Sequence, residues 1–139
     1  MDAYIDPVRE DFSAFAKLSI AGPIHMLNLI RLREKAAYPD GRDATGREAY
    51  AAYGRESAPY FEGQGGRIVW RGVPRFALIG PGEETWDIGF VAAYPSKDAF
   101  IAMVKDPGYQ RAVVHRQAAV LTSRLHCFEA REGAGSVFG

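Results

Sequence analysis

The sequence predicts an α+β domain of the ferredoxin-like βαββαβ type, built on a four-stranded antiparallel sheet. The main evidence lies in residues 65–96, where two runs of apolar, β-branched and aromatic residues flank the polar turn GPGEET and predict a β-hairpin. Pro95 and Ser96 then supply a strand stop and a helix N-cap. A strand–helix unit before this hairpin and a helix–strand unit after it complete the βαββαβ order.

The first elements are a short helix and a strand. Asp6 can cap the helix and Pro7 can occupy its first turn, and apolar residues recur at helical spacing over residues 7–18. The run at residues 24–30, IHMLNLI, is the first expected strand of the sheet. It is apolar on both faces apart from two polar residues, which indicates that both faces are covered.

A long polar loop over residues 31–44 leads to the second helix. Thr45 and Glu48 form the T-x-x-E pattern of a capping box, which predicts where this helix begins. Pro59 is expected to end or kink it near its last turn. One stripe of the helix carries Tyr50, Tyr53, Ser57 and Phe61.

The sequence of the C-terminal half predicts an interrupted helix and the last strand of the sheet. A helix begins at Ser96 and runs to residue 104. Asp106 and Pro107 restart it as cap and first-turn residue, and it continues to residue 120. Residues 121–131 form the last expected strand.

The length of 139 residues and the 47% of hydrophobic residues suit one domain with a substantial core. We divide the chain into an N-terminal helical extension (residues 1–23), a ferredoxin-like domain (24–131) and a Gly-rich flexible tail (132–139). Seventeen basic residues balance seventeen acidic ones, so we expect neither nucleic acid nor a membrane surface as a partner. The lone Cys127 and an acidic N-terminus unlike a signal peptide predict a cytoplasmic protein.

The strand expected over residues 86–94 has two apolar faces. Its alternate residues are Trp86, Ile88, Phe90, Ala92 and Tyr94 on one side, and Asp87, Gly89, Val91 and Ala93 on the other. Two helices can cover only one side of a four-stranded sheet, so the second face needs another cover. A second copy of the same sheet is the simplest cover, and we therefore expect a homodimer formed through sheet faces.

Paired tyrosines, glycines, turn residues and caps recur through the chain: Tyr50, Tyr53, Gly65, Gly66, Trp86, Asp87, Pro95, Ser96, Asp106, Pro107, Tyr109, Arg116, Ser123 and Arg124. With these residues, the segment from Ile24 to Arg131 resembles an uncharacterised bacterial family, catalogued as a domain of unknown function (number 1330), within the dimeric α+β barrel superfamily. The resemblance implies the fold and a dimer. It implies no reaction, because wider relatives include cofactor-free monooxygenases, lactone isomerases and haem enzymes.

His115, Arg116 and Asp87 are the candidates for chemistry. His115 could act as an acid or base, and Arg116 could hold a carboxylate. Tyr109, Ala112, Val113 and Arg116 share one helical face, so Arg116 is expected to point toward the sheet, buried with a carboxylate or carbonyl partner. His115 lies off to the side and could equally be a surface or interface residue. Asp87 could be a base or a structural ion pair with Arg71 or Arg116.

Four further residues are candidate ligand contacts. Asn28 is polar within an apolar strand and Arg31 follows at the strand's end, so the two could hold a carbonyl or carboxylate, although backbone hydrogen bonds would satisfy Asn28 as well. Trp70 could line a pocket or belong to the core. Tyr53 could either hydrogen-bond a ligand or pack in the helix stripe.

The three histidines show no metal-binding spacing, and the sequence carries no phosphate-binding loop or nucleophile elbow, so no metal or cofactor is expected. Two hypotheses follow. The first is a small-molecule-binding homodimer, which could also be a cofactor-independent enzyme acting on a small carbonyl or carboxylate compound. The alternative is a non-catalytic structural or assembly module in which the same polar residues hold the protein together and leave no pocket.

Overall fold

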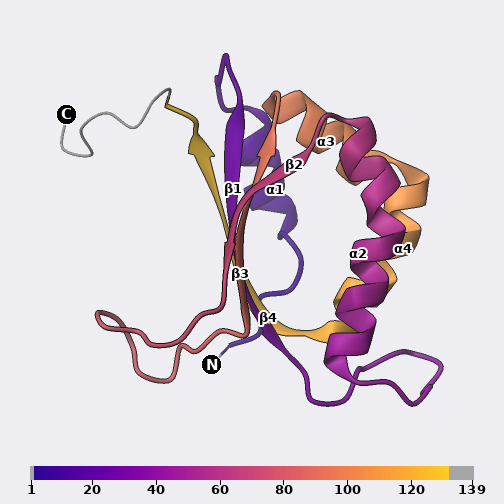
Figure 1. Ribbon diagram of the computed structural model, residues 1–139. Coiled ribbons are helices and arrows are strands. Elements are labelled where there is room, and N and C mark those ends of the chain that lie inside the picture. The colour runs from indigo at the N-terminus through magenta and orange to yellow at the C-terminus, as the bar shows by residue number, and fades with distance from the viewer. Residues whose placement is uncertain (1, 132–139) are drawn as a thin grey trace.

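The structure is a computed structural model that describes residues 2–131, so the predicted tail lies outside the described residues. Its strands form one antiparallel sheet in the order β2-β3-β1-β4 (Figure 1). The elements in chain order are α1 (Arg9–Ala16), β1 (Ile24–Leu32), α2 (Gly46–Gly63), β2 (Arg67–Gly72), β3 (Ile88–Tyr94), α3 (Lys97–Lys105), α4 (Pro107–Ala119) and β4 (Val120–Glu129). The predicted βαββαβ fold is confirmed, with an additional helix at its N-terminal end.

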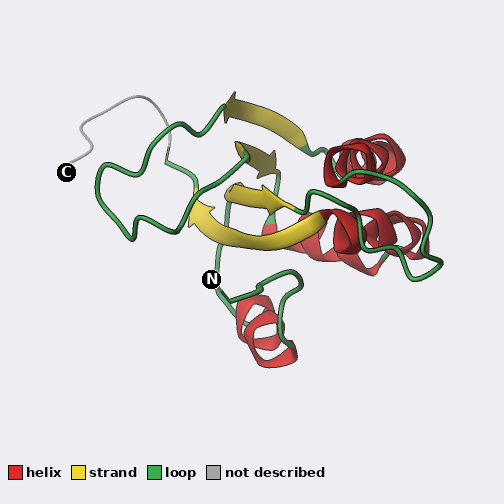
Figure 2. Ribbon diagram, turned by 90° about the horizontal axis from the view of Figure 1, so that it is seen from below, coloured by secondary structure: helices red, strands yellow, loops and turns green. Residues whose placement is uncertain are grey.

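The helices lie on one side of the sheet. α2 and α4 run along this side, α3 continues it, and α1 lies on the same side near the β4 edge (Figures 1 and 2). The opposite side, which we call the open face, carries Leu27, Leu29, Trp70, Val91 and Phe128, because these residues alternate with the helix-facing ones in the strand register. Trp70 and Phe128 are each 54% exposed.

Three of the four helix starts follow the predicted caps. The Thr45 hydroxyl accepts from the Glu48 N–H and the Glu48 carboxylate accepts from the Thr45 N–H, which completes the capping box. Ser96 caps α3 and Asp106 caps α4, with Pro107 in its first turn. The hydrogen bond from the Thr45 backbone holds the pKa of Glu48 below its usual value.

The expected cap of the first helix is wrong. Val8 occupies the N-cap position of α1 in an extended conformation, with no side-chain cap hydrogen bond. Asp6 cannot serve there because its carboxylate accepts a hydrogen bond from Gln117 on α4 and lies near Arg116. The N-terminal segment is thus bound to the folded domain before the helix begins.

The end of α2 also differs from expectation. The helix continues past Pro59 to Gly63, and a turn ends it in which the Gly65 N–H donates to Glu62 and Gly66 donates to Phe61. Gly65 adopts a φ of 78°, a left-handed conformation that favours glycine. The backbone turn at Gly65, rather than the proline, therefore sets the helix end.

The β2–β3 connection is longer than the predicted hairpin turn. β2 ends at Gly72 and β3 begins at Ile88, so GPGEET is only part of a loop over residues 73–87. Trp86 and Asp87 precede the strand instead of opening it. Pro74 and Pro81 lack the N–H that a strand ladder requires, which explains why pairing stops early.

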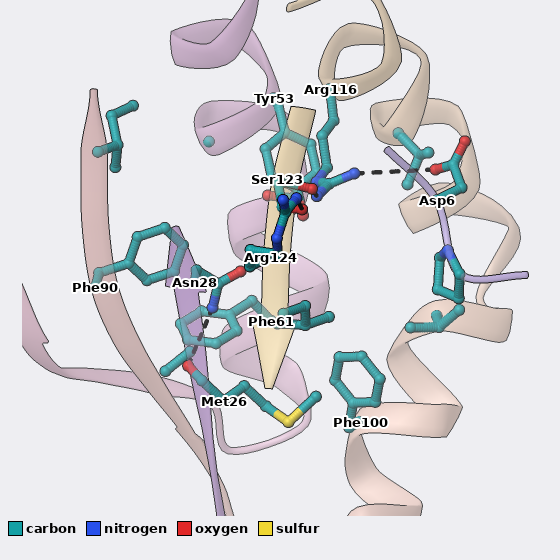
Figure 3. Close-up of a pocket in the computed structure, with 18 of the residues that line it drawn as sticks. Asp6, Met26, Asn28, Tyr53, Phe61, Phe90, Phe100, Arg116, Ser123 and Arg124 are labelled. Atoms are coloured by element: carbon teal, nitrogen blue, oxygen red, sulfur yellow. Dashed lines mark hydrogen bonds and ion pairs between the residues drawn. The ribbon is translucent and has the colours of Figure 1, made fainter. Parts of the chain in front are cut away.

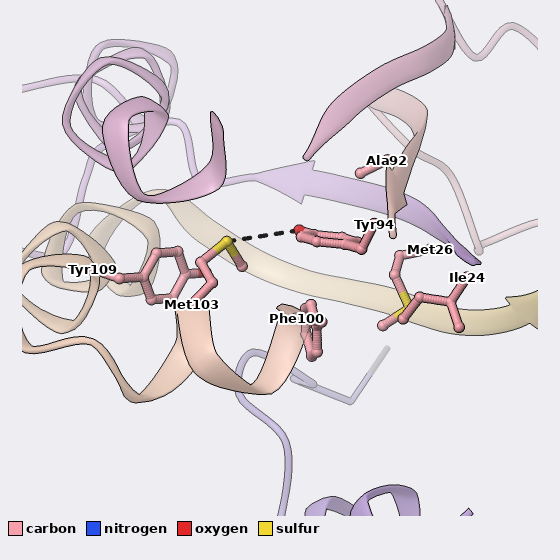
Figure 4. Close-up of a cluster of buried hydrophobic side chains, with 7 residues drawn as sticks. All are labelled: Ile24, Met26, Ala92, Tyr94, Phe100, Met103 and Tyr109. Atoms are coloured by element: carbon pink, nitrogen blue, oxygen red, sulfur yellow. Dashed lines mark hydrogen bonds between the residues drawn. The ribbon is translucent and has the colours of Figure 1, made fainter. Parts of the chain in front are cut away.

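Two apolar clusters fill the space between the sheet and the helices. The first, shown in Figure 4, contains Ile24, Met26, Ala92, Tyr94, Phe100, Met103 and Tyr109. The second surrounds Ile30 and Val120 at the other end of the sheet. No helix within residues 2–131 is both long enough and apolar enough to cross a membrane.

Candidate functional site

A cleft of about 1780 Å³ lies between the helix-covered face of the sheet and the helices. All four strands contribute to its floor, and α2, α3 and α4 form its walls. The N-terminal segment from Tyr4 to Val8, together with α1, forms a further wall. Figure 3 shows that one end of the cleft is apolar and the other is polar.

Aromatic rings and methionine line the apolar end. Met26 and Phe90 rise from the sheet, Phe61 comes from α2 and Phe100 from α3 (Figure 3). Such surfaces suit the flat apolar body of a small molecule, because ring faces and thioethers pack well against one another.

Arg116 dominates the polar end. Its side chain is 13% exposed, its Nη1 donates to the Ile5 carbonyl, and its Nη2 donates to the Ser123 hydroxyl at 3.2 Å. The only carboxylate within 4.0 Å in the described part of the chain is that of Asp6, at 3.9 Å and 47% exposed. The predicted burial of Arg116 with a carbonyl partner is confirmed, and its charge is opposed only by a distant, half-exposed carboxylate.

Two tyrosine hydroxyls meet in the cleft. The hydroxyls of Tyr53 and Tyr109 are 2.7 Å apart, and both residues line the cleft. Burial raises the pKa of Tyr109 far above its ordinary value, with Tyr53 adding to the effect, and burial raises the pKa of Tyr50 in the same direction. The phenols of Tyr109 and Tyr50 therefore stay protonated at neutral pH and act as hydrogen-bond donors or acceptors rather than as bases.

Two further candidates lie on the cleft wall with partners of their own. The Asn28 amide Nδ2 donates to the Met26 carbonyl at 3.0 Å (Figure 3). The Asp87 carboxylate accepts from the Leu32 N–H at 2.8 Å, and its own N–H donates to Ile30. Within residues 2–131 Asp87 forms no ion pair with Arg71 or Arg116, so the expected pairing is wrong: the carboxylate instead joins the start of β3 to the end of β1.

Three candidates, Trp70, Arg31 and His115, lie outside the cleft lining. A β-bulge between Ile68 and Trp70 sets Trp70 opposite Val91, and this places the indole on the open face. Arg31 extends toward the β2–β3 loop, where its Nη1 lies 3.5 Å from the Glu83 carbonyl oxygen. Of the candidate residues, Asn28 and Asp87 therefore line the cleft, whereas Trp70 and His115 do not.

His115 contacts different residues from its neighbour Arg116. Its Nδ1 is 2.6 Å from the Tyr38 hydroxyl and its Nε2 is 2.8 Å from the Glu56 carboxylate. One residue along a helix turns a side chain by about 100°, which directs His115 toward α2 and the loop before it. It ties together three segments outside the cleft.

The sequence analysis missed the part of the N-terminal segment that borders the cleft. Ile5 contributes only a backbone carbonyl to Arg116, and a carbonyl carries no residue-specific signal. Ser123, which the sequence marks only through the family resemblance, accepts from Arg116 and donates to the Tyr4 carbonyl. Cys127, whose thiol pKa is raised by burial, also lines the cleft. Among the described residues, no group of three or more His, Cys, Asp or Glu side chains could hold a metal ion.

The fold and the cleft define a ferredoxin-like α+β domain with an internal space large enough for a small molecule. The chain belongs to the family described as a domain of unknown function (DUF1330), whose model matches residues 42–128. Two crystal structures of the RPA0582 protein of Rhodopseudomonas palustris, of unknown function, are 53% identical to the chain. They cover 97% and 95% of it and 100% of their own chains, with TM-scores of 0.92 and 0.90.

More distant structures share the fold. SnoaB, a cofactor-independent oxygenase from Streptomyces nogalater, is 19% identical, with 84% of this chain and 100% of that chain covered and a TM-score of 0.53. A dimeric protein of unknown function and ferredoxin-like fold from Bacteroides fragilis is 13% identical, with 81% and 100% covered and a TM-score of 0.50. No curated protein matches the chain.

Proposed function

We propose that the chain is a homodimer whose cleft binds a small compound with an apolar, ring-containing body and a carboxylate or carbonyl group. The observation that carries the proposal is the buried Arg116 guanidinium at one end of a cleft whose surface is largely apolar. Small-molecule sites have this composition, with an apolar lining and a few convergent polar groups that fix orientation.

Arg116 is suited to an anionic or carbonyl group because donors and charge remain available. A guanidinium carries five N–H donors, and two of them bond the Ile5 carbonyl and the Ser123 hydroxyl. Both acceptors are neutral, so they leave the positive charge in place. A ligand carboxylate or carbonyl oxygen would gain a charge-assisted hydrogen bond there.

Tyr53 and Asn28 complete the proposed anchors. Because burial keeps the Tyr109 phenol protonated, the Tyr53–Tyr109 pair can donate one hydrogen bond to a ligand oxygen while keeping the bond between the two hydroxyls. Asn28 uses one amide hydrogen for Met26 and retains its side-chain carbonyl for a ligand donor. Asp87 stands at the rim with its carboxylate on the Leu32 N–H.

We extend the proposal to chemistry without a cofactor on the bound compound. Arg116 and a neutral phenol could stabilise negative charge that develops on a carbonyl oxygen, as preorganised donors do in many enzymes. SnoaB, which shares the fold, is described as a cofactor-independent oxygenase. The alternative of a structural module without a ligand predicts a cleft filled by its own side chains, and the volume of about 1780 Å³ favours the ligand site.

The dimer part of the proposal rests on the open face. Trp70 and Phe128 are half exposed there and lie near Leu27 and Val91, so the face carries an uncovered apolar patch in one chain, with Arg124 and two histidines on the β1–β4 side. A sheet face of this kind can supply the roughly 800 Å² per partner of a standard interface. The Bacteroides fragilis neighbour is described as dimeric.

A thermal-shift screen of aromatic carboxylates and aromatic ketones tests the ligand site. A compound present at about a hundred times its dissociation constant stabilises the fold by roughly 2.7 kcal/mol. Tyr53→Phe should reduce this stabilisation, because it removes a hydroxyl from the cleft and keeps the ring. Tyr38→Phe is the matched control, since Tyr38 lies outside the cleft lining, and it should leave the stabilisation unchanged.

Thiol labelling of Cys127 gives an independent measurement. The thiol lies in the cleft, so a bound compound should slow its reaction with an aromatic disulfide reagent. A panel in which no compound raises the melting temperature or slows labelling would overturn the ligand proposal. Incubating a bound compound without any cofactor, followed by mass spectrometry, then tests the chemistry: an unchanged compound would limit the protein to binding.

A further inference from the structure

The loop between β2 and β3 exposes four large apolar side chains within seven residues. We call residues 73–82 the arm. Val73, Phe76, Leu78 and Ile79 are 77%, 86%, 85% and 96% exposed, far more than the apolar residues of the open face. Soluble proteins rarely leave such a contiguous apolar segment in water unless it has a partner.

The arm has a fixed base. Just after it, Glu84 forms an ion pair with Arg124 at 3.2 Å, and the Arg124 guanidinium lies over the Trp86 ring at 5.2 Å. Asp87 then joins the chain to β1 through Leu32 and Ile30. These contacts hold the direction in which the arm leaves the domain.

That direction is away from the helices. In Figure 1 the loop extends to the side of the sheet opposite α2 and α4, and in Figure 2 it again extends away from them. Val73, at the start of the arm, borders the cleft, and the rest of the arm projects beyond the open face. Arg124 belongs to the open face by strand register, opposite Leu29, so the base of the arm and the open face are continuous.

We propose that the arm clasps a second copy of this chain, packing its apolar side chains against that copy when the two open faces meet. The proposal rests on the homodimer part of the proposed function and adds a contact that sheet packing alone does not require. Burying four such side chains adds about half of the roughly 800 Å² per partner that a standard interface needs. The apolar character of both surfaces and their continuity favour a second copy over an unrelated partner.

Replacing the arm's apolar residues tests the proposal. The triple variant Phe76→Ser, Leu78→Ser and Ile79→Ser removes exposed side chains that contribute little to the packing of one chain. Sedimentation equilibrium should show the dimer dissociation constant raised by at least about a hundredfold, with the circular dichroism spectrum unchanged. Val114→Ser, on the outer surface of α4, is the control and should leave the constant unchanged.

Trypsin digestion of the unaltered full chain provides a second measurement. Arg75 is exposed within the arm, so cleavage after it should be slow at concentrations where the dimer forms and should accelerate on dilution to the monomer. Trp70→Glu on the open face should also weaken the dimer and accelerate this cleavage.

The outcomes separate the two proposals. A parent dimer that Trp70→Glu dissociates and the arm variant does not would overturn the arm contact and leave the sheet-face dimer standing. A parent protein that is monomeric at micromolar concentration would overturn the dimer and the arm together, whereas the ligand screen reports on the cleft in either case. Sedimentation of the parent with lipid vesicles, lost in the arm variant, would identify a membrane as the arm's partner and also overturn the proposal.

Discussion

Replacing Arg116 with methionine should destabilise the protein strongly, because methionine keeps much of the apolar stem and removes the charged donors. The Ile5 carbonyl would lose its charged partner, and the Ser123 hydroxyl would lose one of its two. Hydrogen bonds to charged groups contribute about 1.5–3 kcal/mol each. Losing two of them should therefore lower the free energy of unfolding by at least about 3 kcal/mol. Asp6 adds little, because its carboxylate is 3.9 Å away and half exposed.

The change can be measured by thermal and urea unfolding. For a chain of this size, about 3 kcal/mol corresponds to a decrease in melting temperature of roughly 9 °C. Arg111→Met is the matched control: Arg111 lies on the same helix, is exposed, and makes no side-chain hydrogen bond or ion pair within residues 2–131. It should shift the melting temperature by only about 1–2 °C, which is the size of ordinary surface effects.

A second variant separates the hydrogen bonds from the ion pair. Asp6→Asn removes the carboxylate charge and keeps the N-terminal backbone, so it should cost less than about 1 kcal/mol. If Arg116→Met and Arg111→Met melt at the same temperature, the inference that Arg116 holds the N-terminal segment against α4 and β4 is refuted. A large loss in Asp6→Asn would show instead that the ion pair is the main contact.

Four further substitutions test the packing, a cap and a buried phenol. Gly108→Ala should destabilise the protein by about 1–3 kcal/mol, because the added Cβ would overlap the Tyr60 ring. Gly54 lies in α2 with open space around it, so Gly54→Ala should stabilise the protein by about 0.5–1 kcal/mol in the same melting assay. Thr45→Ala should cost about 1 kcal/mol in urea unfolding through loss of the α2 cap, and an unchanged midpoint would contradict the cap's role. Burial raises the folded-state pKa of Tyr109 above its unfolded value of about 10, so its contribution to stability is fully present below that pH and is lost as the pH rises above it. The part of the phenolate absorbance that Tyr109→Phe removes should therefore appear only as the protein unfolds in alkali, and the variant should show weaker alkaline destabilisation.

Local chemistry made much of the fold predictable from the sequence. The capping residues Thr45, Ser96 and Asp106 each act within three residues along the chain, so their patterns predicted three helix starts correctly. Helical spacing also predicted that Arg116 faces inward and that His115 does not share its direction. These inferences needed only the geometry of one element.

Inferences that depended on several elements were less successful. The side of the sheet on which Trp70 lies depends on a bulge, since one extra residue reverses the alternation of the strand after it. Asp6 has the composition of a helix cap, but a more distant hydrogen bond with Gln117 takes its carboxylate. No local pattern records either event, because both depend on which segments meet after folding.

The polar end of the cleft shows why the site was harder to predict than the fold. Arg116 is held by a carbonyl 111 positions earlier in the chain. Any residue at position 5 would present the same carbonyl. The electrostatic consequence is nevertheless specific. Neutral acceptors satisfy hydrogen bonds of the cation without cancelling its charge, and the nearest carboxylate is partly screened by solvent. An anion that enters the cleft and comes within about 4 Å of Arg116 would gain about 4 kcal/mol of Coulomb energy at an effective dielectric constant of 20, before its own desolvation is counted. The same neutral contacts that stabilise the N-terminal segment therefore leave Arg116 able to attract a ligand, which is why one residue can carry both the stability prediction and the proposed binding site.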